Sequence, residues 1–260
     1  MDLSNLTREQ LQAMGLSEEQ IAAILNTVEE NKGGQGVPFP LLKINYDMDF
    51  GKVGAYGYNP QKDENGNLSG YEFVSDKVTI RPIKSVYQYS KFDVEQNKPT
   101  VTSNIFPLRE AKKAYDLKSG TPISVLKASD NDITFQRILL GVIDIDGEEK
   151  PFIMYAKGSF LYELSNILNQ YKNDGHMTHK FTLGTEKRKK GTVVWFVPTL
   201  EDVNELAQDE FIKNIKTDAE LIRQFDEWIA SVNAGGNDTP STVSTKATSD
   251  VEVDESEINF

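Results

Sequence analysis

Alternation of polar and apolar residues organises the middle of the chain. The segment Val78–Phe92 reads V-T-I-R-P-I-K-S-V-Y-Q-Y-S-K-F, and its period of two is typical of a β-strand with two unlike faces. Rings and cations share the odd positions, which include Arg81, Tyr87, Tyr89 and Lys91. Rings stack on unpaired bases while nearby cations neutralise phosphates. A half-exposed strand whose tyrosines cover the edge of a core explains the same pattern.

The same alternation predicts strands on both sides of this segment. Leu41–Phe50 alternates, and Lys52–Tyr58 places Lys52, Tyr56 and Tyr58 on one face. Gly54 lies between them, and glycine inside a strand marks a bulge or a close approach by another chain. Further strands are expected at Thr121–Lys127, Ile133–Asp144 and Phe152–Lys157, with an Asp146-Gly147 hairpin turn before the last of these.

A second hairpin is expected from Lys180–Leu183 and Thr192–Val197. Its loop, Gly184–Gly191, contains four consecutive cations: Lys187, Arg188, Lys189 and Lys190. Consecutive like charges repel one another, and a polyanion would relieve that repulsion. A solvated turn is the alternative, because charge runs often lie at the surface without a ligand.

Helical spacing of apolar residues predicts helices at three places along the chain. Residues 6–30 read as a helical pair in which Thr7 and Ser17 begin capping boxes, and this pair is expected to pack on the body, self-associate or dock a partner. Ser159 caps a helix that runs to Tyr171. Two closing helices are expected after Thr199 and Thr217. The chain thus divides into a helical pair at 1–32, a body at 37–232 and a low-complexity acidic tail at 233–260, which we expect to be disordered.

The net charge of −12 is distributed unevenly along the chain. Residues 1–32 hold six acids and two bases, and residues 237–260 hold six acids and one base. Residues 77–127, in contrast, hold ten bases and four acids, and residues 150–191 hold eight bases and three acids. Positive charge is therefore concentrated in two central blocks, which suits an anionic partner better than the total suggests.

Composition also excludes several classes of protein. The chain has no cysteine, so it has neither disulfides nor Cys-based zinc sites, which suits a reducing cytoplasm. It has no apolar run of membrane-spanning length and no signal peptide at its start, so we expect a cytoplasmic protein without a membrane partner.

No catalytic or metal-binding constellation is visible in the sequence. Asp63, Asn65 and Asn67 have calcium-loop spacing, but Leu68 stands where the loop requires glycine. His176 and His179 lack further ligands. We therefore expect no enzyme activity, no metal and no cofactor.

The end of the chain is its most specific feature. A spacer leads to D-V-E-V-D-E-S-E-I-N-F, in which acids precede a terminal Phe260. An apolar terminus on an acidic tether can occupy a small pocket of a partner while its carboxylates steer it to a basic surface. This ending, the basic and aromatic strands and the hairpin at 182–198 resemble bacteriophage single-stranded DNA-binding proteins. The N-terminal helical pair departs from that layout.

The resemblance implies a fold and a function. The fold would be mainly β with flanking helices (α+β), an OB-like β-barrel with the helix 159–171 inserted between hairpins. The protein would coat single-stranded DNA, independently of sequence, during phage DNA replication, recombination and repair in the host cytoplasm. The tail would recruit a polymerase or helicase-primase through Asp254, Glu255, Glu257 and Phe260. Homo-oligomers and RNA binding stay open.

Two groups of residues are expected to form the binding site. The groove would be lined by Lys52, Tyr56, Tyr58, Arg81, Tyr87, Tyr89 and Lys91. The loop Lys187–Lys190 would hold the backbone of the strand. A protein–protein adaptor, such as a virion or polymerase accessory subunit, is the main alternative and predicts no salt-sensitive binding of oligonucleotides. A metal-dependent nuclease is a second alternative and requires at least three converging acids.

Overall fold

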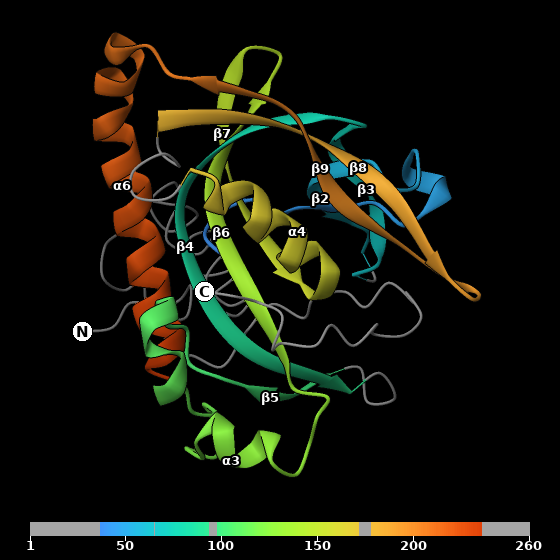
Figure 1. Ribbon diagram of the computed structural model, residues 1–260, viewed down its shortest axis with the longest axis vertical. Coiled ribbons are helices and arrows are strands. Elements are labelled where there is room, and N and C mark those ends of the chain that lie inside the picture. The colour runs from blue at the N-terminus through green and yellow to red at the C-terminus, as the bar shows by residue number, and fades with distance from the viewer. Residues whose placement is uncertain (1–36, 65, 94–97, 172–177, 236–260) are drawn as a thin grey trace, which may run out of the picture.

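The computed structural model describes residues 37–64, 66–93, 98–171 and 178–235, which form two antiparallel sheets, two longer helices and several short helical elements (Figure 1). The smaller sheet has the strand order β1-β2-β3, with β1 Leu42–Ile44, β2 Tyr56–Lys62 and β3 Leu68–Ser75. A short 3-10 helix, η2 (Met48–Phe50), precedes β2.

The larger sheet has the order β7-β6-β4-β8-β9, and β5 pairs with the far end of β4. Its strands are β4 Val78–Asp93, β5 Lys98–Thr102, β6 Thr134–Ile145, β7 Glu148–Lys157, β8 His179–Lys190 and β9 Val193–Glu205. The helical elements are η3 Leu108–Lys113, α3 Ile123–Lys127, α4 Gly158–Asn169 and α6 Gln208–Asn233.

Strand β4 is the common element of the larger sheet. It pairs with β6 from Thr79 to Ser90, with β8 through Val78–Ile80 and with β5 near its end. The β4–β6 register shifts at Pro82, which has no N–H to donate to a ladder, so a bulge there lets the long strand bend. Figure 1 shows β4 as one long curved strand that ends beside β5.

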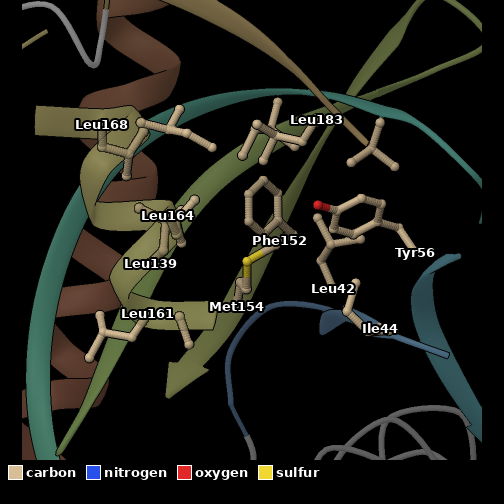
Figure 2. Close-up of a cluster of buried hydrophobic side chains, with 14 of the residues drawn as sticks. Leu42, Ile44, Tyr56, Leu139, Phe152, Met154, Leu161, Leu164, Leu168 and Leu183 are labelled. Carbon is tan, nitrogen blue, oxygen red and sulfur yellow. The ribbon is translucent and has the colours of Figure 1, made fainter. Parts of the chain in front are cut away.

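Each face of the larger sheet carries its own helix and its own core. Helix α4 packs against β6, β7 and β9 on the face that also meets the smaller sheet. Figure 2 shows the centre of this core, to which both sheets and α4 contribute: Leu42, Ile44, Tyr56, Leu139, Phe152, Met154, Leu161, Leu164, Leu168 and Leu183. On the opposite face, Phe225, Trp228 and Val232 of α6 pack on Ile138, Leu140 and Val142 of β6. Both faces of strand β6 are thus buried.

Several predicted elements are confirmed. The predicted strands Ile133–Asp144 and Val78–Phe92 correspond to β6 and β4. The Asp146-Gly147 turn closes β6 and β7, and both residues have the positive φ that a two-residue hairpin of this kind requires. The helix predicted at 159–171 corresponds to α4, but its N-cap is Lys157, so the predicted cap at Ser159 is wrong.

Other predicted boundaries are wrong. The four cations Lys187–Lys190 belong to strand β8, because the hairpin turns only at Gly191 and Thr192. Strand β9 continues through Thr199 to Glu205, so a single helix, α6, replaces the two predicted closing helices. Thr121–Lys127 contains helix α3, which follows Pro122, and not a strand.

The mainly β class with flanking helices is confirmed, but neither described sheet closes on itself. The two sheets pack on a shared core, and the contacts between their backbones and side chains include the bridge from Leu41 to Ile153 and hydrogen bonds from Tyr56 and Thr185. The closed OB-like barrel therefore stays a prediction. The N-terminal pair at 1–32 and nearly all of the tail at 233–260 lie outside the described residues. Among the described helices, none is both long and apolar enough to cross a membrane.

Candidate nucleic-acid interface

The first two predicted groove tyrosines lie in the core. Tyr56 is completely buried in the cluster of Figure 2, and its hydroxyl donates a hydrogen bond of 3.0 Å to the Gly184 carbonyl oxygen. The Tyr58 hydroxyl donates to the Pro151 carbonyl oxygen at 3.2 Å. Burial, with the nearby charges of Glu72 and Glu148, raises the pKa of Tyr58 to about 12. These rings join the two sheets and present no face to a base, which corrects their assignment to a groove.

Lys52 lies apart from them, before strand β2. Its ammonium group forms an ion pair of 2.7 Å with Asp76, and both side chains are exposed. The cation is thus available at the surface, but not beside the rings with which it was expected to act.

Arg81 is also buried, and it serves a different purpose. Its guanidinium contacts both carboxylate oxygens of Asp218 on α6, at 2.6 and 3.1 Å, and Glu149 on β7 at 2.9 Å. Burial disfavours the charged forms of both Arg81 and Glu149, but their hydrogen bonds favour those charged forms more strongly. The pKa of Arg81 is therefore raised and the pKa of Glu149 is lowered. Arg81 therefore fixes α6 to the sheet and is removed from the candidate interface.

Farther along β4, rings and cations do come together. The Tyr87 ring stacks on Phe135 of β6 with ring centroids 5.2 Å apart, and Tyr89 contacts both Phe135 and Phe106. Tyr87 is buried, whereas Tyr89 is half-buried with the Lys127 ammonium 5.2 Å from its ring centroid. Of the four predicted tyrosines, Tyr89 alone keeps a partly open ring. We call Tyr87, Tyr89, Phe106 and Phe135 the ring row.

Lys91 follows the ring row on β4, and its charge is already neutralised. The ammonium group lies 2.7 Å from Asp130 and 3.4 Å from Asp132. Hydrogen bonding to Asp130 raises the pKa of Lys91 and lowers that of the carboxyl group. A phosphate would have to displace these acids to reach this cation.

Arg137 of β6 was not among the predicted residues, although it stands beside the ring row. Its Nε and Nη2 donate to the Tyr87 hydroxyl at 3.1 and 2.7 Å, and its Nη1 donates to Ser165 Oγ of α4 at 3.3 Å. The sequence did contain a signal, an arginine inside the apolar strand Ile133–Asp144, because arginine is rarely buried unless it is paired.

The hairpin cations alternate between the two faces of β8. Arg188 is paired with Glu163 of α4 at 2.9 Å and with Glu186 at 3.6 Å. Lys187, Lys189 and Lys190 are exposed and have no carboxylate within ion-pair distance among the described residues. Figure 1 shows the β8–β9 hairpin extending beyond the rest of the described chain.

Helix α4 separates the ring row from the hairpin. Ser165, which contacts Arg137, and Glu163, which contacts Arg188, are two residues apart on the helix. At about 100° per residue these contacts lie on nearly opposite sides of α4. Tyr162 is half-buried and lies between these sides on the solvent face, beside exposed Asn166. The candidate interface thus crosses α4, from the ring row to the hairpin.

The remaining predicted site residues are outside the described chain. They are Asp254, Glu255, Glu257 and Phe260 of the tail. Asn65 and His176, rejected above as metal ligands on their sequence context, also lie outside the described chain. Among the described side chains, no three His, Asp or Glu residues converge into a metal site.

Comparison of the chain with family models, with curated proteins and with solved structures found no match. The assignment of function therefore depends on the residues themselves.

Proposed function

We propose that this protein binds single-stranded DNA without reading its sequence and coats exposed strands during phage DNA replication, recombination and repair. The observation that carries the proposal is the hairpin with Lys187, Lys189 and Lys190. All three cations of β4 are paired with carboxylates, whereas these three hairpin lysines are exposed without one in the described chain. Clustered cations without counter-ions are suited to a phosphate backbone.

Aromatic side chains near α4 support the same proposal. Tyr89 and Tyr162 are half-buried, so each offers part of a ring to an unpaired base. Stacking of a base on an aromatic ring contributes about 1–3 kcal/mol and is independent of sequence. A strand that ran from the ring row across α4 to the hairpin would combine stacking with charge neutralisation.

An OB-like body belongs to this proposal. The smaller sheet meets β7 through the Leu41–Ile153 bridge and meets β8 through the hydrogen bonds Tyr56 to Gly184 and Thr185 to Gly54. These contacts connect the two open sheets around α4, as the walls of a barrel would be connected. The acidic tail would recruit replication proteins such as a polymerase or helicase-primase, in the host cytoplasm.

A salt titration of a fluorescent oligo-dT tests the proposal, with a duplex of equal length for comparison. In the triple variant Lys187→Ala, Lys189→Ala, Lys190→Ala, Arg188 keeps its pair with Glu163. If each lysine contacts one phosphate, the slope of log K against log salt should fall by about 2, since each contact contributes roughly 0.7 for a single strand.

A matched control replaces three exposed lysines elsewhere, Lys62, Lys213 and Lys216, with alanine. This variant has the same net charge as the hairpin variant. Because its lysines lie away from the hairpin, its slope should stay at the wild-type value. An equal loss of slope in both variants would show that only total charge matters. A wild-type protein that binds neither oligonucleotide would exclude the proposal and favour the adaptor.

A further inference from the structure

Arg137 is a buried cation whose hydrogen-bond acceptors are all neutral. The residue is only 5% exposed, and its guanidinium donates to the hydroxyls of Tyr87 and Ser165. No described carboxylate lies within 4.0 Å of its guanidinium. Removing an ionised group from water without a counter-ion is costly, so the burial of the Arg137 guanidinium indicates a role other than stabilising the fold.

Arg81, a buried arginine of the same sheet with a structural role, provides a comparison. It is 2% exposed, and two carboxylates, Asp218 and Glu149, neutralise it. Arg137 lies at a comparable depth on the neighbouring strand and lacks both. The fold thus neutralises one buried guanidinium and leaves the other without a counter-ion, with only the Tyr87 ring, its centroid 5.4 Å from Arg137 Cζ, beside the charge.

Arg137 has hydrogen-bond donors that a ligand could use. A guanidinium has five N–H groups, and three are used here, two toward Tyr87 and one toward Ser165. The Tyr87 hydroxyl, itself held by a ring stacked on Phe135, fixes the plane of the guanidinium. The Ser165 contact is the longest of the three at 3.3 Å, and a hydroxyl can rotate to donate to an oxyanion instead.

We propose that Arg137, with Ser165, binds a phosphate group, and that this phosphate belongs to a nucleic-acid strand lying along the ring row. A planar guanidinium fork matches the paired oxygens of a phosphate, and such charge-assisted bonds are among the stronger ones. The inference rests on the proposed function for the source of the phosphate. The chemistry of the site, a tetrahedral oxyanion on a buried guanidinium, does not depend on that function.

Ser165→Asp provides the central test in the full-length protein. It supplies an internal carboxylate next to Arg137 Nη1, imitating the Asp218–Arg81 pair, so this variant should fold and should melt at a higher temperature. Gln208→Glu is the matched control, because it adds the same charge to an exposed residue at the start of α6, on the opposite face of the larger sheet. Arg137→Met removes the cation itself.

Two measurements separate the outcomes. The first is the rise in Tm on replacing chloride with inorganic phosphate at equal ionic strength. The second is the affinity for oligo-dT. We expect wild type and Gln208→Glu to show the phosphate-specific rise and to bind the oligonucleotide. Ser165→Asp and Arg137→Met should lose the rise and bind the oligonucleotide about tenfold more weakly, as one charge-assisted contact implies.

A Ser165→Asp variant that gains stability but keeps the phosphate response and the oligonucleotide affinity would overturn the inference, because Arg137 would then be a structural cation only. If Arg137→Met does not fold, Ser165→Asp still decides between these results. A phosphate response that depends on Arg137 in a protein that binds no oligonucleotide would support the anion site, identify free phosphate as its ligand and refute the proposed function.

Discussion

Gly54 occupies a position that no other residue can share without rearrangement. Its φ of +91° lies in the left-handed region, and a Cβ atom built there would lie 2.2 Å from the Phe196 ring. The same segment receives a hydrogen bond of 2.7 Å from Thr185 to the Gly54 carbonyl oxygen. The backbone before β2 therefore packs directly on the β8–β9 hairpin.

We expect Gly54→Ala to destabilise the protein by about 2–4 kcal/mol, the sum of backbone strain and overpacking. Gly147→Ala is the control, since Gly147 also has a positive φ, +85°, but has open space around it. Its cost should be about 1–2 kcal/mol, from strain alone. Urea unfolding measures both values. Equal midpoint shifts would show that Phe196 moves aside without cost.

Single residues show what alternation along the chain can and cannot predict. The predicted strand Lys52–Tyr58 is wrong at Gly54, which lies in a turn before β2, although another segment, at Phe196, does approach this glycine closely. Alternation also placed Tyr56 and Tyr58 on one face. It could not say that the other sheet covers this face, because the covering residues Gly184 and Pro151 are far away in sequence. A strand pattern defines two faces and does not identify the exposed one.

Helix α6 is attached to the larger sheet by interactions of two kinds. Phe225, Trp228 and Val232 are buried against β6 and β4, and two cations of β4 reach carboxylates on the helix. Arg81 meets Asp218 where both side chains are buried, whereas Lys84 meets Asp226 at the surface. The two ion pairs join the same elements and differ mainly in depth.

This difference predicts unequal costs for the same chemical change. Asp218→Asn leaves a buried guanidinium without its main counter-ion and should cost about 3–5 kcal/mol of unfolding free energy. Asp226→Asn breaks a solvated pair and should cost about 0–1 kcal/mol. Chemical denaturation of both variants, with the m-value as a check on two-state behaviour, measures the contrast. Similar losses would mean that burial of the Arg81 pair has no energetic consequence.

Predicted element types were more accurate than predicted boundaries. The apolar runs of β6 and α4 are long and periodic, so their types were evident. The boundary of β8 was misplaced because its four cations suggested a loop, whereas backbone pairing with Val193–Phe196 continues the strand through them. At Thr199, a residue typical of helix caps lies within a strand because its backbone pairs with Gly184. Ladder partners distant in sequence decided both cases.

Charge separation is the main property at the scale of the molecule. The chain carries a net charge of −12, and five of its acids lie between Asp250 and Phe260. These carboxylates repel a phosphate backbone over distances of about one Debye length, roughly 10 Å at 0.1 M salt. The tail should therefore weaken binding of nucleic acid and do so mainly at low salt.

Deleting Asp250–Phe260 should tighten oligo-dT binding at 50 mM salt, and the gain should shrink as salt is raised. The deletion should leave the unfolding transition unchanged. A variant with all five acids replaced by their amides, and with Phe260 retained, should show the same gain. Weaker binding by the truncated protein would contradict the assigned role of the tail.

The long reach of β4 has a consequence for biosynthesis. The hydroxyl groups of Thr79 and Thr182 meet across the β4–β8 ladder although 103 residues separate them. At a translation rate of about 5–20 residues per second, β8 leaves the ribosome roughly 5–20 s after β4. During that interval the nascent β4 can pair with β6 but has an unpaired edge at Val78–Ile80. That edge is where a nascent chain of this protein is most open to a chaperone or to aggregation.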